Sequence, residues 1–435
     1  MKIFLFAAVF IFSSLILLSC KKDNPVKPKE QPQAIINLSV EDVSCTEAWI
    51  KLSTSNISLP ADVQIIKDSN LTRTISLTGA DTILYIDSLS PKQTYSFHTI
   101  LQPYNHTGEI TSNSVSVTTM DTTSHKFTWQ TYTCGGQAGS CVLNDIAIID
   151  KNNIWAVGEI YLNDSLGNTI SYNAVHWDGT NWEVKRILYL NGFAPMTAIW
   201  AFNENDIWFG IGYLIHWDGT SYTEMSIPDW HIRTNKIWGI SSNEIYVVGN
   251  NGNIAHYQNG NWSRIESGTD LNINDIYGAY NDNTNQWKIL APAANVLQSL
   301  DRDLLSINDN YVDHLDTSPI TGTLRTIWFI PNRTYLLGGG GIYRKSYLTD
   351  SLWEKKDNGI TDYSTNRIRG IAINDIVLTG GYGELLHYNG YSFKSYLNQT
   401  QINGNYYSVD IKNNIIVAVG NDSPAAVIII GNRTN

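Results

Sequence analysis

The stretch from residue 199 to residue 249, IWAFNENDIWFGIGYLIHWDGTSYTEMSIPDWHIRTNKIWGISSNEIYVVG, holds one complete structural repeat and the start of the next. Two apolar anchors, Ile199 and Ile207, lie eight residues apart and flank the polar turn Asn205-Asp206. A third apolar run ends in His216-Trp217-Asp218-Gly219, and an aromatic residue follows six positions after the histidine. Short apolar runs separated by Asn, Asp and Gly predict β-strands joined by tight hairpins.

The same pattern recurs along the whole C-terminal part of the chain. The anchor pairs are Ile146 and Ile154, Ile199 and Ile207, Ile237 and Ile245, Ile276 and Gln286, Ile327 and Thr334, Ile368 and Ile376, and Tyr407 and Ile415. The 308 residues from 126 to 433 therefore provide 44 residues for each of seven units. This length matches the 40–45 residues of a four-stranded propeller blade, so we expect an all-β chain with a seven-bladed β-propeller over residues 126–433.

The two ends of the repeat array predict how the ring closes. The last unit, which ends at Ile428-Ile429-Ile430, lacks a fourth strand. The segment 126–132, KFTWQTY, at the start of the array has the pattern of the missing strand. A ring closed by this N-terminal strand leaves no free sheet edge on which other chains could pair.

The His-Trp-Asp-Gly runs resemble the boxes of Asp-box proteins, and the repeat resembles the propellers of photosystem II assembly-factor-like bacterial proteins. The resemblance implies the fold and no particular activity. A sialidase-like enzyme would need an arginine cluster, a tyrosine nucleophile and an acid. The arginines at 325, 344, 367 and 369 show no such arrangement in the sequence, so we expect neither enzymatic activity nor a cofactor.

Residues 1–33 have the pattern of a targeting segment and a tether rather than of a folded domain. Lys2 is followed by an apolar segment, residues 3–18, that is shorter than the about 20 residues of a membrane-spanning helix. It ends in Leu17-Leu18-Ser19-Cys20, which resembles the lipobox of bacterial lipoproteins and implies cleavage before Cys20 and its acylation. An ordinary secretory signal is the alternative. The following Lys21-Lys22-Asp23 resembles the surface-export tethers of Bacteroidetes lipoproteins, so residues 1–20 are predicted as signal peptide and 21–33 as a flexible tether.

Residues 34–122 show short alternating strands, such as those at 48–52 and 95–100. The stretch 89–95, LSPKQTY, resembles the loop and tyrosine corner of fibronectin type III modules, and 112–119, SNSVSVTT, resembles their last strand. We therefore expect a fibronectin type III sandwich over 34–122. The whole chain resembles surface lipoproteins that pair such a module with a propeller.

Composition narrows the set of partners. Charged residues make up only 16 % of the chain and aromatic residues 11 %, which favours strands over helices. The net charge is -11, and loss of residues 1–20 removes only Lys2 and gives -12. Without a basic stripe to neutralise phosphates, a nucleic-acid partner is not expected. We expect a monomer.

Candidate ligand-binding residues lie on loops that join the outer strand of one blade to the inner strand of the next. They are Trp230, His231, Tyr311, His314, Tyr363 and Tyr406. Loops on a rigid scaffold commonly carry function, and exposed aromatic rings stack on sugars or anchor protein ligands. The alternative interpretation is that these residues only cap the rim of each blade.

Three further groups of residues are predicted to be structural. The repeated histidines lie on a wide ring and cannot converge on one metal ion, so each is expected to bond a neighbouring hairpin. The aromatic residues that follow the anchors, Trp200, Trp238, Tyr277 and Trp328, with Arg369 at the equivalent place, are expected to pack between blades. Cys134 and Cys141 bracket a glycine-rich loop and are candidates for a disulfide, whereas Cys45 is expected to be a buried filler.

These observations predict a lipid-anchored, surface-exposed outer-membrane protein that binds glycan or protein ligands. Two alternatives remain open at this stage. One is a surface enzyme of polysaccharide breakdown, for which no pair of carboxylates can be nominated. The other is a structural component of the cell envelope or of secretion machinery.

Overall fold

The computed structural model describes residues 33–101, 108–227, 233–295, 301–309 and 311–434. Regular structure in these residues consists of β-strands and one 3-10 turn, η1 (Gly381–Gly383), which confirms the all-β prediction. Within the same ranges we find no helix of the length and apolar character needed to cross a bilayer. The predicted signal peptide, Cys20 and almost all of the predicted tether lie outside the described residues.

The described chain groups into two compact units. One contains the residues up to Ser39 together with Lys51–Ile83 and Ser96–Val115, and the other contains Val40–Ile50, Leu84–Tyr95 and everything from Ser116 onward. This division passes through the N-terminal strands rather than between residues 122 and 126. The domain boundaries expected from the sequence therefore stay predictions.

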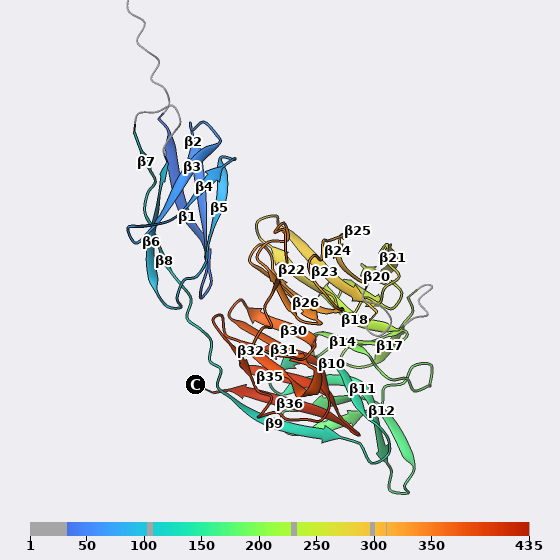
Figure 1. Ribbon diagram of the computed structural model, residues 1–435. Coiled ribbons are helices and arrows are strands. Elements are labelled where there is room, and N and C mark those ends of the chain that lie inside the picture. The colour runs from blue at the N-terminus through green and yellow to red at the C-terminus, as the bar shows by residue number, and fades with distance from the viewer. Residues whose placement is uncertain (1–32, 102–107, 228–232, 296–300, 310, 435) are drawn as a thin grey trace, which may run out of the picture. The chain divides into compact units, whose positions relative to one another are not determined.

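The N-terminal strands form two sheets (Figure 1). The three-stranded sheet has the order β1-β2-β5, with β1 (Ile35–Val43), β2 (Ala48–Ser55) and β5 (Asp81–Ile86). The second sheet has the order β4-β3-β6-β7, with β8 also paired to β6: β3 (Ala61–Lys67), β4 (Asn70–Leu77), β6 (Thr94–Leu101), β7 (Ile110–Thr111) and β8 (Val115–Thr118). Buried and exposed side chains alternate along β5 and β6, as in strands with one face in a core.

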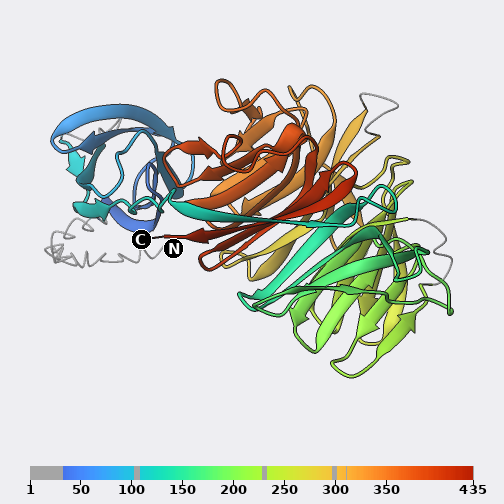
Figure 2. The same ribbon diagram turned by 90° about the horizontal axis from the view of Figure 1, so that it is seen from below.

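The remaining strands form seven antiparallel sheets of four strands, which we call blades 1 to 7 (Figures 1 and 2). Blade 1 comprises β10 (Val142–Asp150), β11 (Asn153–Asn163), β12 (Thr169–Trp177) and β13 (Trp182–Lys185). Blade 2 comprises β14 (Ala198–Asn203), β15 (Asp206–Gly210), β16 (Leu214–Trp217) and β17 (Tyr222–Met225). Blade 3 comprises β18 (Thr234–Ser241), β19 (Glu244–Gly249), β20 (Asn253–Gln258) and β21 (Asn261–Glu266). The strands of each blade follow one another in chain order, as the repeat predicts.

Blades 4 to 6 have the same order. Blade 4 comprises β22 (Tyr277–Asn281), β23 (Gln286–Ala294), β24 (Arg302–Ile307) and β25 (Val312–His314). Blade 5 comprises β26 (Leu324–Ile330), β27 (Thr334–Gly339), β28 (Ile342–Lys345) and β29 (Glu354–Lys355). Blade 6 comprises β30 (Thr365–Ala372), β31 (Asp375–Gly380), β32 (Leu385–Tyr388) and β33 (Phe393–Ser395). Blade 7 differs because its fourth strand comes from the start of the array: β34 (Asn405–Lys412), β35 (Ile415–Asp422), β36 (Ala425–Arg433) and β9 (Phe127–Cys134).

The seven blades form a ring. The inner strands β10, β14, β18, β22, β26, β30 and β34 pack against one another in that order, and β34 also packs against β10. β9 pairs with β36 from Ala426 opposite Cys134 to Arg433 opposite Phe127. The segment predicted to complete the last blade therefore does so, and the two ends of the array are held in one sheet (Figure 2).

The repeated histidines tie the hairpins of their own blades together. In blade 2, His216 Nε2 lies 2.8 Å from Asp206 Oδ1, and its ring stacks on Trp208 with the ring centroids 4.4 Å apart. His176 bonds Asn153 and His387 bonds Asp375 in the same way, each at 2.9 Å. These three histidines have the structural role predicted for them, and the partner of each is the first residue of the second strand of its blade. In blade 3, His256 stacks on Tyr246, but its Nε2 is buried without a described hydrogen-bond partner.

The aromatic residues after the anchors pack between blades, as expected. Trp238 and Trp328 are almost fully buried. A Cβ on Gly278 would lie 2.3 Å from the Trp238 ring, and one on Gly370 would lie 2.8 Å from Trp328. Each indole therefore lies against a glycine of the next blade, which leaves no room for a larger residue there.

Two expectations about particular residues are wrong. Cys134 and Cys141 are unbonded thiols, and the Cys141 sulfur instead accepts a hydrogen bond from the Tyr161 amide within the core of blade 1. Tyr407 is not the anchor of blade 7. The strand pairing skips residue 407 between Tyr406 and Ser408, so Val409 takes the place that Ile146 has in blade 1.

Candidate functional site

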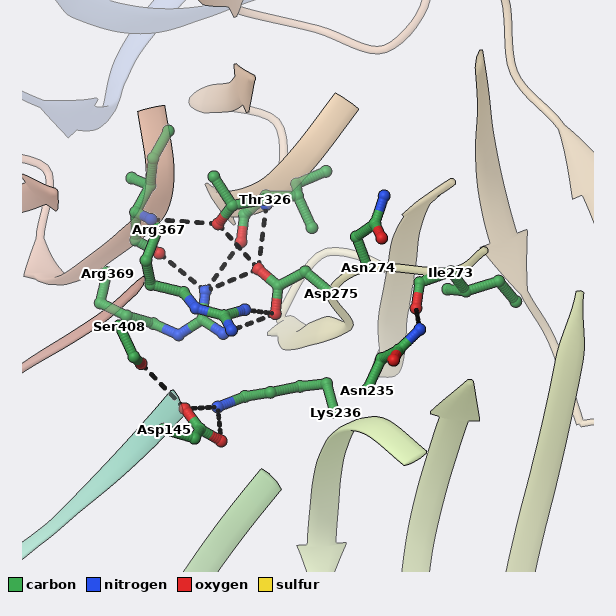
Figure 3. A network of polar contacts seen from close by, with 12 residues as sticks. Asp145, Asn235, Lys236, Ile273, Asn274, Asp275, Thr326, Arg367, Arg369 and Ser408 are labelled. Carbon is green, nitrogen blue, oxygen red and sulfur yellow. Dashed lines mark hydrogen bonds and ion pairs between the residues drawn. The ribbon is translucent and has the colours of Figure 1, made fainter. Parts of the chain in front are cut away.

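One position of the repeat carries polar side chains to the centre of the ring. It is the residue immediately before the anchor, and the seven equivalents, which we call the axial ring, are Asp145, Ala198, Lys236, Asp275, Thr326, Arg367 and Ser408. Because side chains alternate along a strand, these residues face away from the buried anchors. Contacts between non-neighbouring blades place them at the axis, and Figure 3 shows six of them, with Arg369, converging there.

The Asp145 carboxylate joins four blades. The Lys236 ammonium of blade 3 lies 2.6 and 2.7 Å from its two oxygens. The Ser408 hydroxyl of blade 7 donates to it at 2.8 Å, and the Ile199 amide of blade 2 donates at 3.0 Å. Asp145 has no solvent exposure, so every one of these contacts is made inside the protein.

The Asp275 carboxylate joins the other three blades. The Thr326 hydroxyl and the Ile327 amide of blade 5 donate to Oδ2 at 2.8 and 3.2 Å. Arg369 of blade 6 donates from both terminal nitrogens, at 2.7 and 3.0 Å, and Arg367 Nη1 makes an ion-pair contact with Oδ1 at 2.5 Å without the angle of a hydrogen bond. Two carboxylates thus connect all seven blades (Figure 3).

The electrostatics of the axis follow from this pairing. Burial alone would raise the pKa of Asp145 and Asp275, but the facing cations hold both values below the usual range. Burial lowers the pKa of Lys236 to about 8, against the opposing pull of Asp145. Asp410, two residues after Ser408, accepts hydrogen bonds from the Ile148 and Ile411 amides, and burial raises its pKa. The axis is therefore filled by charges that mostly neutralise one another.

A second polar ring lies one residue before the first. The backbone bulges there in β10, β18, β26, β30 and β34, where the strand pairing skips one residue. Side chains at this position donate to a carbonyl of the next blade, always two residues before its axial-ring residue. The bonds run from Asn144 to Met196 (2.8 Å), Thr197 to Thr234 (2.5 Å), Asn235 to Ile273 (3.0 Å), Asn274 to Leu324 (2.9 Å) and Asn366 to Tyr406 (2.8 Å). We call these bonds the bulge latches.

Two positions of this ring break the pattern, and they lie close together. Arg325 donates from Nη1 to the side chain of Asn366 instead of to a carbonyl. Its Nε is buried without a partner, and no described carboxylate forms an ion pair with it. Burial lowers the pKa of Arg325, and the nearby Tyr407 opposes that shift. We call Arg325, Asn366 and Tyr407 the axial mouth; the Tyr407 side chain is 36 % exposed there.

The predicted ligand residues are scattered. Trp230 and His231 lie outside the described residues. Tyr363 lies on the loop between β29 and β30, as expected, and its ring packs against Tyr382 with the centroids 5.2 Å apart. Tyr406 is fully buried and its hydroxyl donates to the Thr400 carbonyl, so its prediction as a ligand-binding residue is wrong.

Of the two candidates in blade 4, only Tyr311 lies at the opposite end of the blade from the predicted one. Tyr311 is exposed, but it closes the hairpin between β24 and β25. In a four-stranded antiparallel blade that hairpin lies opposite the loops that lead to the next blade. His314 belongs to the outer strand itself, with Nδ1 2.6 Å from Asp303 Oδ2. Tyr311 therefore does not share a face with Tyr363, whereas His314 lies at the end of β25 that leads to the next blade, where a Cβ on Gly268 would lie 2.7 Å from its Nε2.

The axial ring and the mouth were not identified from the sequence. The signal was present, because a charged or hydroxyl residue precedes the anchor in blades 1, 3, 4, 5 and 6, within otherwise apolar runs. The residues on the other side of the anchor are mostly aromatic, which is the more conspicuous pattern in the sequence. Only Arg369 of that set takes part in the network.

No protein-family model matches the chain, and no curated protein matches it by sequence. Among solved structures, YCF48 bound to a D1 peptide is similar with a TM-score of 0.53 and 15 % identity, covering 71 % of this chain and 97 % of that chain. The part of the chain that forms the seven blades is a β-propeller.

Other propellers are similar at lower scores. They include YCF48 from Cyanidioschyzon merolae (TM-score 0.48, 14 % identity, 69 % of this chain and 98 % of that chain) and the WD40 propeller domain of Doa1 (TM-score 0.48, 12 % identity, 71 % and 98 %). At these identities the likeness extends to the fold alone. Function has to be argued from the propeller's own residues.

Proposed function

We propose that the protein is a non-catalytic binding protein whose propeller holds an acidic segment of a partner protein at the axial mouth. The observation that carries this proposal is the state of Arg325. The cations of the axial ring face Asp145 or Asp275, whereas Arg325 has no described carboxylate partner. A half-buried guanidinium without a counter-ion is costly, and a ligand carboxylate would offset that cost.

The chemistry of the mouth suits such a ligand. A guanidinium binds a carboxylate through two parallel hydrogen bonds, which gives both strength and orientation. The half-exposed Tyr407 provides an aromatic surface next to this cation, and Tyr is frequent among interface hot spots. The YCF48 structure, in which a propeller is bound to a D1 peptide, is a precedent for a peptide ligand on this fold.

Selection from a peptide display library tests this proposal. Peptides selected on the wild-type protein should be enriched in Asp, Glu or a free C-terminus. Their binding should fall about tenfold or more on Arg325→Gln, the size of effect expected when a charged hydrogen-bond partner is lost. Arg186→Gln, a change in a loop arginine outside the axial mouth, is the matched control and should bind normally. Selected peptides without acidic groups, or binding indifferent to Arg325→Gln, would overturn it.

A glycan ligand is the alternative carried over from the sequence. The same purified protein, applied to a glycan array, decides between the two. Glycan binding that survives Arg325→Gln would move the ligand site away from the axial mouth. Release of sugar products in that assay would instead favour a surface enzyme.

We further propose that Cys20 is lipidated and that residues 34–122 form a fibronectin type III spacer between membrane and propeller. The tyrosine-corner geometry supports the spacer, because the Tyr95 hydroxyl accepts a hydrogen bond from the Ser90 amide at 2.9 Å. With Cys20 intact, the mature protein should fractionate with the outer membrane and its N-terminal peptide should carry acyl mass. Cys20→Ala should release the protein from membranes, and an unchanged distribution would contradict the anchor.

A further inference from the structure

A cavity of about 490 Å³ lies on the loop side of blade 5, separate from the axial mouth. Its lining includes Gly340, Asp357, Gly359, Asp362, Tyr363 and Ser364. The loop from β29 to β30 supplies most of this lining, and Gly340 comes from the hairpin between β27 and β28. Ser364 lies two residues before Asn366 of the axial mouth, so both features belong to the same face of the propeller.

The hairpin between β27 and β28, which forms one side of the cavity, has no side chains. Gly340 and Gly341 form the whole connection between β27 and β28. A Cβ on Gly340 would meet nothing closer than 3.4 Å, whereas one on Gly341 would lie 2.8 Å from Asp357 Oδ2. Gly340 therefore has room for a side chain in van der Waals contact with residues 321–323, whereas Gly341 lies directly against Asp357 Oδ2.

Asp357 is the unusual group of this cavity. It is 92 % buried, because only 8 % of its surface is exposed. Its Oδ2 lies 3.3 Å from the Lys355 ammonium, but its Oδ1 is buried without any described partner. An ionised oxygen that is buried and unpaired costs free energy, and such groups in native proteins call for an explanation.

We infer that this cavity receives the basic side chain, lysine or arginine, of a protein ligand. An ammonium or guanidinium would donate to Asp357 Oδ1 and neutralise its charge at the same time. Asp362, exposed at the edge of the cavity, adds a second carboxylate. Lys355 offsets only one of these two charges, and its own side chain is 48 % exposed.

The aromatic residues beside the carboxylates favour the same class of ligand. Tyr363 lines the cavity and packs against Tyr382, whose surface is 69 % exposed. The face of a tyrosine ring attracts a cation, and more strongly where water is partly excluded. A sugar could also contact these rings and bond Asp357, but it would leave the excess negative charge unbalanced.

This inference goes beyond the proposed function and depends on different residues, so the two can fail separately. The test follows the backbone amide signals of Gly340, Gly341 and Gly359 by NMR in the full chain. The probes are Nα-acetyl-lysine amide and Nα-acetyl-arginine amide, with Nα-acetyl-norleucine amide as the uncharged control and methyl β-glucoside as the sugar. The cationic probes should shift these signals in a saturable manner, and the norleucine probe should not.

Two variants decide where the probes bind. Asp357→Asn should weaken binding of the cationic probes about tenfold, because the charge at Oδ1 is lost. Gly340→Leu should block them by filling the cavity while both carboxylates stay in place, so it serves even where Asp357→Asn does not fold. Asp282→Asn, an exposed acid on blade 4, is the matched control. Equal shifts with norleucine, no shift with either cation, or a response to the glucoside alone would overturn the inference.

Discussion

Asp275 shows how one buried carboxylate can balance the charges of several blades at the axis of a ring. Its carboxylate has no solvent exposure and still carries a charge, because Arg367 and Arg369 both face it. A buried ion pair need not be more favourable than apolar packing, but removing one partner leaves the others buried and uncompensated. Removing one charged member of the network should therefore destabilise the fold by more than the net stabilisation that the intact network provides.

Asp275→Asn should lower the free energy of unfolding by about 3–5 kcal/mol, the cost of breaking a buried charge pair. The asparagine keeps the shape and the bonds from Thr326 and Ile327 but leaves two guanidinium groups without a counter-ion. Urea unfolding measures the effect. Asp282→Asn changes the same residue type at an exposed site and should stay within about 0.5 kcal/mol of the wild type. A similar small loss for both variants would show that Asp275 is not needed to balance the axis.

The sequence could not predict this pairing. Asp275 and Arg369 are 94 residues apart and belong to blades that are not neighbours. The repeat shows that both residues lie next to an anchor, which predicts an inner strand. Only the ring geometry brings them together, because seven inner strands converge on one axis. The structural roles of His216 and Trp238, in contrast, depend on one blade and its neighbour, and the repeat was enough to predict them.

The bulge latches act between elements rather than within one. Each latch joins an inner strand to the segment that enters the next inner strand, so five of the seven junctions between blades are connected by side chains at this position as well as by packing. Asn suits this position because its Nδ2 donates to a carbonyl while the bulge leaves it outside the regular ladder. In the Asn235 latch, Nδ2 bonds both the Ile273 carbonyl of blade 4 and Asn250 Oδ1.

Asn235→Asp should destabilise the propeller by about 1–2 kcal/mol, because an ionised carboxylate cannot donate and would face a carbonyl oxygen. Hydrogen exchange should show faster opening at the Ile273 amide than in the wild type, next to the lost bond. Asn243→Asp, in the exposed turn between β18 and β19, is the control and should leave both readouts unchanged. Unaltered exchange at Ile273 in Asn235→Asp would contradict the role of the latch.

The same bulges explain where the sequence register failed. In β10, β18 and β30 the pairing is irregular twice, before the anchor and again near the turn. β34 has only the first irregularity, so its first hairpin is one residue shorter and the eight-residue spacing was counted from Tyr407. A bulge inserts one residue without any composition signal of its own. The error also placed Tyr406 on a loop, although it belongs to the core.

At the scale of the whole molecule, counting repeats predicted the ring and its closure but not what fills it. The length of 44 residues per unit and the missing last strand were both visible in the sequence, because each is a property of one unit or of the chain ends. The axial network is a property of all seven units together. Arg433 adds a further connection, since its guanidinium contacts Asp375 of blade 6 from the strand that pairs with β9.

The buried carboxylates also make the stability of the whole propeller depend on pH. The pKa of Asp275 and of Asp145 is held below the value of about 3.9 that aspartate has in an unfolded chain. At acid pH the unfolded state therefore binds more protons than the folded state, so this contribution to stability is complete above about pH 4 and is lost as the pH falls through the folded values. Asp410, whose pKa is raised by burial, acts in the opposite sense.

We therefore expect the urea midpoint of the propeller to fall as the pH is lowered below about 4, with two lowered carboxylates outweighing Asp410. Lys236, with a pKa of about 8, titrates on the alkaline side and does not overlap this window. Asp275→Asn should be less stable at neutral pH but should lose less on acidification, because one of the titrating groups is gone. Parallel curves for the two proteins would mean that acid unfolding starts outside the axis.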